Sequence, residues 1–334
     1  ENATIGVFNP GTGTVVYDRD FGGTDQNIFN TTYNNLEIDG SGDKDVGANL
    51  TVNGNLTITN GTLDLTNDGA GNFDLALATD FSMTGGSLTA GSSDAHTVGG
   101  SWSETGGTFA PTAGTFTFNN GVGTITQFAG NNFNNLTVSA GTKTAGSDLN
   151  IDGALLIDQA TSVLDMSGTN YTLDVEGDLT ISNNGTFTPQ GSTTHNVAGN
   201  WDDDGGTFTP TAGTITLSTS SGGIGTTIKT KATNKFFNLI INALENKTVQ
   251  SDLTIDGNLT ITNAALDLTN GGVGNFDLAL TGDFSMAAGS LLAGTSDAHT
   301  VGGSWSETGG IFTPTAGTFT FNNGVGTITQ FAGN

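Results

Sequence analysis

The stretch GNLTITNGTLDLTN at residues 54–67 returns as GNLTITNAALDLTN at residues 257–270. Each copy alternates Leu or Ile with Thr over short runs separated by Asn and Gly, which places the apolar side chains on one face of a short strand. The similarity extends well beyond these stretches. Residues 52–131 and 255–334 align without a gap at an offset of 203, and 66 of the 80 positions are identical. Near-identical copies are typical of arrays in which each repeat packs on the next through the same contacts.

The repeat unit is about 100 residues long, because Trp102, Trp201 and Trp305 are spaced 99 and 104 residues apart. On this spacing, residues 1–34 are the end of a preceding repeat, 35–134 are repeat 1, 135–237 are repeat 2, and 238–334 are a truncated repeat 3. We expect the four segments to form one continuous solenoid. Eight residues that recur at the same place in each unit are expected to pack repeat on repeat: Trp102, Trp201, Trp305, Leu136, Leu239, Phe109, Phe208 and Phe312.

A shorter period of about 20 residues lies inside each unit. Gly153-Ala-Leu, Gly177-Asp-Leu and Gly199-Asn-Trp each open a short apolar run, with spacings of 24 and 22 residues. A period of this length, with Gly/Asn turns between short strands, is typical of one coil of a parallel β-helix. The sequence therefore predicts an all-β, parallel β-solenoid. Tandem β-sandwich domains are the alternative, but a sandwich gives no reason for an internal repeat of about 22 residues.

Composition excludes several classes of partner. The chain has 32 acidic and 7 basic residues, a net charge of −25, and no cysteine. Binding to nucleic acid needs clustered Lys and Arg, and docking on anionic lipid needs them too, so neither is expected. No apolar run approaches the ~20 residues that cross a bilayer. We therefore expect no direct membrane insertion, and the negative charge favours solubility.

The strings FNPGTGTVVY, FAPTAGTFTFNNG, FNNLTV and DLTIDGNLTI resemble the repeats of bacterial surface β-strand-repeat proteins, which are filamentous-haemagglutinin-like. The resemblance covers essentially the whole chain. It implies a secreted, right-handed parallel β-helix at the cell surface, serving as a stalk, an adhesin or an extracellular fibre. It transfers no catalytic residue.

No converging catalytic constellation is visible in the sequence, and we predict that the chain is not an enzyme. The only Arg is Arg19, whereas a lyase acting on uronates needs several cations. Acidic residues are too abundant for any one pair to indicate a hydrolase, and the run at residues 202–204 is expected to lie in a turn. His96, His195 and His299 are separated by about five coils each, too far apart to share a metal ion.

One segment has the alternating oxygen ligands of a calcium loop. It runs Asp39-Gly-Ser-Gly-Asp43-Lys-Asp45. Asp39, Asp43 and Asp45 are therefore candidate Ca²⁺ ligands, and Ca²⁺ is the only cofactor that the sequence suggests. A solvated turn is the alternative, and it is favoured because the segment lacks a downstream bidentate Glu and occurs once.

These patterns favour an extracellular structural repeat protein that forms a fibre, stalk or filament by end-to-end stacking. Its expected partner is another copy of itself, because an uncovered solenoid end exposes strand edges and apolar core. The alternative is an adhesin stalk that presents a tip outside this chain to surface or matrix glycans. Exposed tryptophans would support sugar binding by stacking. A polysaccharide-active enzyme is the least favoured interpretation.

Overall fold

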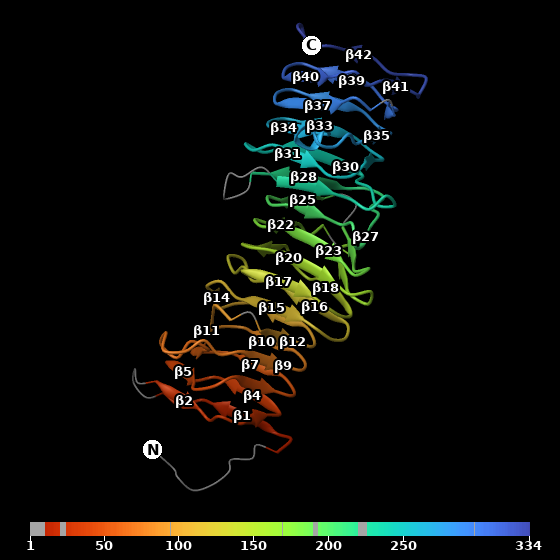
Figure 1. Ribbon diagram of the computed structural model, residues 1–334. Coiled ribbons are helices and arrows are strands. Elements are labelled where there is room, and N and C mark those ends of the chain that lie inside the picture. Colours follow the sequence, from red (N-terminus) through yellow and green to blue (C-terminus); the bar gives the residue numbers. More distant parts are fainter. Residues whose placement is uncertain are drawn as a thin grey trace. The chain divides into compact units, whose positions relative to one another are not determined.

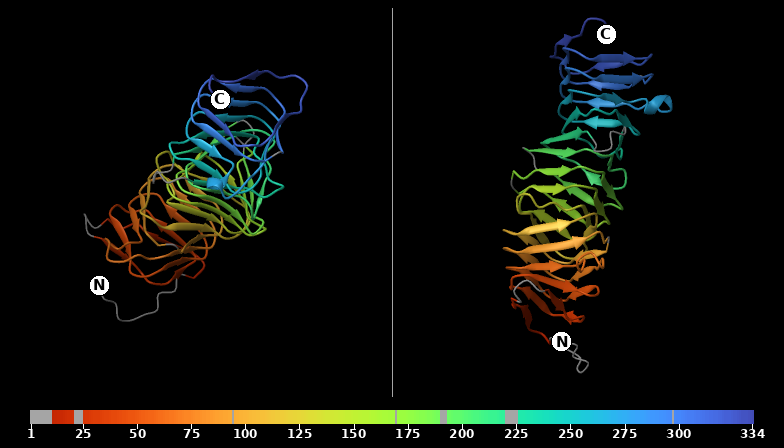
Figure 2. Two further views of the ribbon diagram at one scale, coloured as in Figure 1. Left: turned by 45° about the horizontal axis from the view of Figure 1, so that its top comes forward. Right: turned by 90° about the vertical axis from the view of Figure 1, so that its left-hand side faces the viewer.

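The computed structural model describes residues 11–20, 25–93, 95–168, 170–189, 193–219, 226–296 and 298–334. The chain forms two compact units, Glu1–Asp152 (unit 1) and Gly153–Asn334 (unit 2). Within each unit, short strands stack in parallel on the strands of the next turn, as Figures 1 and 2 show. Each unit is therefore a parallel β-solenoid, which confirms the predicted all-β fold. Parallel pairing also excludes the tandem β-sandwich, because sandwich sheets are antiparallel.

Unit 1 builds three sheets, and most of its turns contribute one strand to each. The first sheet contains β1 (Thr14–Tyr17), β4 (Asn35–Ile38), β7 (Leu56–Ile58), β10 (Phe81–Met83), β13 (Trp102–Glu104), β16 (Gly123–Thr126) and β18 (Thr142–Ala145). The second contains β2 (Gln26–Ile28), β5 (Asp43–Val46), β8 (Thr62–Asp64), β11 (Ser87–Gly91) and β14 (Thr108–Pro111). The third contains β3 (Thr32–Tyr33), β6 (Leu50–Val52), β9 (Leu75–Leu77), β12 (His96–Val98), β15 (Thr115–Phe118) and β17 (Asn135–Val138), and β19 (Leu149–Ile151) follows them in the chain.

Unit 2 repeats this plan. One long sheet contains β20 (Leu155–Asp158), β23 (Leu179–Ser182), β26 (Trp201–Asp202), β29 (Thr226–Lys229), β31 (Lys247–Val249), β34 (Ala265–Asp267), β37 (Ser290–Gly294) and β40 (Ile311–Pro314). Another contains β22 (Leu173–Val175), β25 (Thr194–Val197), β28 (Thr214–Ser218), β30 (Asn238–Asn242), β33 (Leu259–Ile261), β36 (Phe284–Met286), β39 (Trp305–Glu307) and β42 (Ile328–Thr329). The third side consists of β21 (Val163–Asp165), β24 (Thr186–Thr188) and β27 (Thr207–Phe208), then of β32 (Leu253–Ile255), β35 (Leu278–Leu280), β38 (His299–Val301) and β41 (Phe319–Phe321).

The strand register explains the alternation of apolar and hydroxyl residues. Leu36 pairs with Leu56, Leu56 with Phe81, and Phe81 with Trp102, so one turn takes 20 to 25 residues. All four of these side chains are buried, whereas Thr57 and Ser82 at the next position face outward and are half-buried. Because side chains alternate across a strand, Leu-Thr-Ile runs place an apolar ladder inside each unit and hydroxyls outside.

The residues predicted to pack repeat on repeat lie inside the solenoid. Trp102, Trp201, Trp305, Leu136, Leu239, Phe109 and Phe208 are buried, and Phe312 is half-buried. Buried tryptophans are unavailable for stacking on a sugar, so that use is excluded. The contact division falls between Asp152 and Gly153. The repeat boundaries at 34/35, 134/135 and 237/238 and the single continuous solenoid stay predictions, and residues 1–10 and 21–24 of the first segment lie outside the described residues.

Candidate functional site

A buried tryptophan–carboxylate contact occurs in both units. The indole Nε1–H of Trp102 donates to Glu104 Oε1 at 2.5 Å, and that of Trp305 donates to Glu307 Oε1 at 2.6 Å. In the middle repeat, Trp201 donates to Asp203 Oδ2 at 3.0 Å. Asp203 is fully buried and lies between the end of β26 at Asp202 and the turn that begins at Asp204.

Each of these carboxylates has further donors that offset its burial. Asn131 Nδ2 donates to Glu104 Oε2 at 2.6 Å, and the backbone N–H of Phe128 donates to the same atom at 3.2 Å. Burial still raises the pKa of Glu104, and burial raises the pKa of Asp203 to about 6. These acids bind the indole and the next turn of their own unit, so their geometry gives them a structural use.

Three lysines are buried, one in each repeat. Lys44, Lys143 and Lys247 are spaced 99 and 104 residues apart, as the tryptophans are. Lys143 Nζ donates to the backbone carbonyls of Asn120, Gly100 and Gly99 at 2.7, 2.9 and 3.0 Å. Sequence reasoning did not single out these three lysines. Their spacing was the signal that could have found them.

The three histidines make the same hydrogen bond in each repeat. Nδ1 of His96, His195 and His299 each accepts a backbone N–H at 3.1 Å, from Leu75, Leu173 and Leu278 respectively. An Nδ1 that accepts leaves the proton on Nε2, and in His299 Nε2 lies 2.9 Å from the carbonyl oxygen of Ala293. Each ring thereby links two turns of its own unit.

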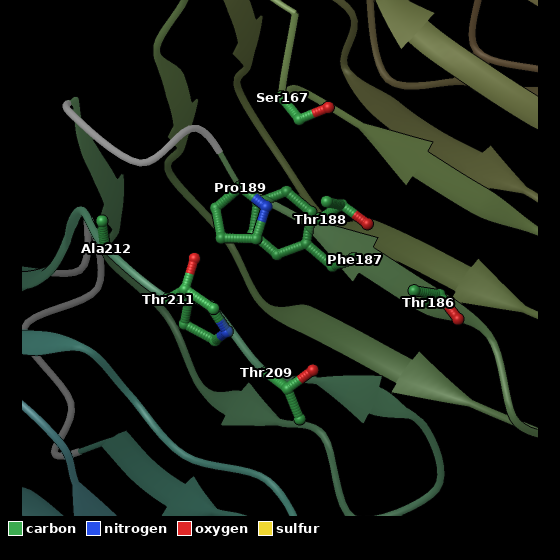
Figure 3. A pocket seen from close by; sticks show the side chains of 9 residues that line it. Ser167, Thr186, Phe187, Thr188, Pro189, Thr209, Thr211 and Ala212 are labelled. Atoms are coloured by element: carbon green, nitrogen blue, oxygen red, sulfur yellow. The ribbon is translucent and has the colours of Figure 1, made fainter.

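A hollow of about 390 Å³ lies in unit 2 and is shown in Figure 3. Its lining consists of hydroxyl-bearing, proline and apolar side chains: Ser167, Thr186, Phe187, Thr188, Pro189, Thr209, Pro210, Thr211 and Ala212. None of these carries a group that titrates near neutral pH. The lining therefore supplies no general acid or base.

A group of three carboxylates lies at the N-terminal part of unit 1. One carboxylate oxygen from each of Asp25, Asp45 and Asp68 lies within 4.8 Å of the others. Of the three predicted calcium ligands, Asp45 belongs to this group. Asp43 is close enough for its charge to raise the pKa of Asp45. Asp39 is engaged elsewhere, because its Oδ1 accepts from Thr59 Oγ1 at 2.6 Å.

The last turn of unit 2 exposes apolar side chains whose counterparts within unit 1 are buried. Ile328 is 64% exposed, whereas its counterpart Ile125 is fully buried. Phe321 is 41% exposed, whereas its counterpart Phe118 is fully buried. These residues surround a hollow of about 140 Å³ lined by Trp305, Glu307, Phe312, Phe319, Phe321, Ile328 and Gln330. We call this surface the terminal face.

Unit 1 shows what normally covers such a surface. Phe133 is fully buried there, and its ring lies against Trp102, Phe109 and Phe116 with centroid separations of 5.2, 5.4 and 5.8 Å. β17 then pairs with β15 in parallel. In unit 2, β41 and β42 are the last strands of their sheets. The terminal face therefore corresponds to the layer that Phe133 and β17 cover in unit 1.

The comparisons with known proteins found no match: no family model, no curated protein and no solved structure is similar to this chain at the threshold applied. In the described part of the chain, no helix is long and apolar enough to span a membrane.

Proposed function

We propose that this chain is an extracellular structural repeat protein whose copies associate end to end into a fibre or stalk. The observation that carries the proposal is one stacking plan repeated in both units, in which parallel strands stack turn on turn and Trp102, Trp201 and Trp305 are buried alike. The resemblance to surface β-strand-repeat proteins supports the extracellular location. A stalk that holds an adhesive tip is the second form of the same proposal.

Two physical terms favour association at the terminal face. The open edges of β40, β41 and β42 carry backbone N–H and C=O groups that can pair with another strand. The exposed apolar side chains also gain ~25 cal/mol for each Å² removed from water. At the corresponding place in unit 1 the strand edge is paired with β17, and the apolar side chains are covered by Phe133.

Sedimentation velocity of the purified 334-residue chain across a wide concentration range tests this proposal. We expect concentration-dependent association of the wild type.

Point variants distinguish association through the terminal face from nonspecific association. Ile328→Lys places a charge on the terminal face and is expected to weaken association. Val122→Lys places the same charge on a side chain of unit 1 that is exposed away from any covering strand, and it is expected to associate as the wild type does. A wild type that stays monomeric at all concentrations, or an Ile328→Lys variant that associates unchanged, would contradict the proposal.

A further inference from the structure

Three turns of unit 1 bring Asp25, Asp45 and Asp68 together. Asp25 directly precedes β2, Asp45 lies in β5, and Asp68 follows β8. β2 pairs with β5, and β5 pairs with β8, so these segments are neighbours in one sheet. Figure 1 shows β2 and β5 side by side. One carboxylate oxygen of each Asp lies within 4.8 Å of the other two.

Asp45 is the central member and has an unsatisfied oxygen. Its side chain is only 4% exposed, and its Oδ1 has no hydrogen-bond partner. A buried acceptor left without a partner costs ~1–3 kcal/mol, and more when the group is charged. Burial raises the pKa of Asp45 to about 6, and the charges of Asp25, Asp68, Asp64 and Asp43 add to this effect. The arrangement therefore concentrates negative charge around a carboxylate that lacks a donor.

The nearest candidate counter-ion in the strand is engaged elsewhere. Lys44 Nζ donates to the backbone carbonyls of Ser41, Gly40 and Gly42 at 2.9, 3.2 and 3.3 Å. Within the described residues, no Lys, Arg or His nitrogen forms an ion pair with Asp25, Asp45 or Asp68. In the part of the chain that the structure describes, no cationic side chain therefore offsets the negative charge of the cluster.

The position of Asp68 is fixed by a fourth carboxylate. Asp64 Oδ1 accepts from the backbone N–H and the Oγ1–H of Thr66, each at 2.7 Å, and its Oδ2 accepts from the backbone N–H of Asp68 at 2.9 Å. These bonds hold the turn that gives Asp68 a φ of +55°. A rigid turn thus places Asp68 next to Asp25, whose charge is the largest cause of the raised pKa of Asp68.

Unit 2 contains the same turn without the cluster. Asp267 Oδ1 accepts from the backbone N–H and Oγ1–H of Thr269 at 2.7 and 2.6 Å, and its Oδ2 accepts from Gly271 N–H at 3.0 Å. Thr248 pairs with Asp267 as Asp45 pairs with Asp64, and Gly271 stands where unit 1 has Asp68. The turn therefore forms without either carboxylate, and their presence in unit 1 needs another reason.

We propose that Asp25, Asp45 and Asp68 bind one divalent cation of the Ca²⁺ type. The donor set consists of carboxylate oxygens, which hard cations prefer, and Ca²⁺ holds its ligands at about 2.3–2.6 Å. Two oxygens on opposite sides of such an ion are about 4.8 Å apart, so the observed spacing lets all three reach one ion. Water molecules complete its coordination. The ion connects three successive turns at the N-terminal part of unit 1 and compensates Asp45.

Calorimetric titration of CaCl₂ into the chelator-treated 334-residue chain, in 150 mM KCl, tests the site. We expect one saturable site with a Kd of about 10⁻⁴ M or tighter. The variants Asp45→Thr and Asp68→Gly copy the residues of unit 2, where the turn is intact, and each should weaken binding at least ~10-fold. Asp39→Asn is the matched control and should bind as the wild type does.

Thermal unfolding gives a second readout. Saturating Ca²⁺ should raise the unfolding temperature of the wild type and of Asp39→Asn, because the ion binds the folded state. The same Ca²⁺ concentration should raise the unfolding temperatures of Asp45→Thr and Asp68→Gly less than that of the wild type. The proposal is overturned if the wild type shows no saturable site, or if both variants titrate as the wild type does. The latter result would mean diffuse attraction to the net charge of −25.

Discussion

Phe133 packs against Trp102 with a ring-centroid separation of 5.2 Å, and it covers the aromatic layer that Trp102 forms with Phe109 and Phe116. Phe236 has the same relationship to Trp201 in unit 2, at 5.0 Å. An aromatic residue that precedes each new repeat thus closes the layer of the repeat before it. The stability of the layer should depend on this contact.

We predict that Phe133→Ala destabilises unit 1 by about 3–5 kcal/mol, because it removes a fully buried ring and leaves a cavity. Urea denaturation gives the loss, and native-state hydrogen exchange shows whether it falls on the amides of unit 1. Val122→Ala alters an exposed side chain and should change stability by less than ~0.5 kcal/mol. Equal losses in the two variants would show that Phe133 does not close the layer.

The buried Lys143 predicts a specific pH dependence. Burial lowers its pKa to about 8 from an ordinary value of 10.5, so between these values the unfolded chain binds more protons than the folded chain. Stability should therefore rise with pH across this window, by about 3 kcal/mol from this group. Lys143→Met should remove that rise, measured as urea stability at pH 7.5 and 10.

Lys229 provides the matched comparison for Lys143. A hydrogen bond from its ammonium to Asp204, at 2.7 Å, raises the pKa of Lys229. A raised lysine pKa gives stability that is lost as pH rises through it, so Lys229→Met should change the pH dependence weakly and in the opposite sense. If Lys143→Met retains the full wild-type rise, Lys143 is charged in the folded protein and the predicted cost of its burial is wrong.

The buried Asp203 predicts a second pH range, at lower pH, in which the stability of the protein changes. Burial raises its pKa to about 6 from 3.8, so the folded chain binds more protons than the unfolded chain between these values. The stability from this group is present below pH 3.8 and is lost as pH rises through 6, about 3 kcal/mol in total. Urea stability of Asp203→Asn should therefore vary less between pH 4 and pH 7 than that of the wild type.

Asp158 serves as the control of opposite sign. A hydrogen bond from Ser182 Oγ, at 2.7 Å, is the largest cause that lowers the pKa of Asp158. Its stabilising contribution is lost as pH falls, so Asp158→Asn should alter the acid limb in the direction opposite to Asp203→Asn. The same change in both variants would mean that acid stability reflects net charge and not these particular contacts.

The fold was predictable because each turn of the solenoid repeats a pattern that can be read directly along the sequence. The Gly-x-Leu openers mark each turn, and the register of Leu36 on Leu56 reproduces the predicted period. The acidic cluster was only partly predictable. The loop pattern of the sequence points to ligands two to four residues apart, from Asp39 to Asp45. In a parallel solenoid, residues one turn apart are neighbours, and Asp25 and Asp45 are 20 residues apart. Asp68 reaches them only through the turn that Asp64 holds.

The matched positions Gly61 and Ala264 give a final prediction. Gly61 has a φ of +69°, and a Cβ there would lie 1.9 Å from the carbonyl oxygen of Gly40. Unit 2 places Ala264 at the equivalent position with a φ of +62°, a conformation that costs an alanine about 1–2 kcal/mol. Gly61→Ala should therefore destabilise unit 1 by at least about 2 kcal/mol, since strain and overlap add.

Ala264→Gly should have the opposite effect and stabilise unit 2 by up to about 1 kcal/mol, because the relief of the left-handed strain exceeds the entropy that glycine gains in the unfolded chain. Urea denaturation of the two single variants and of the double variant measures both effects. The sites lie in different units, so their free-energy changes should add. A stabilised Gly61→Ala would mean that the turn at Gly40 moves away readily, and that the tight stacking of glycine corners does not fix the spacing of the turns.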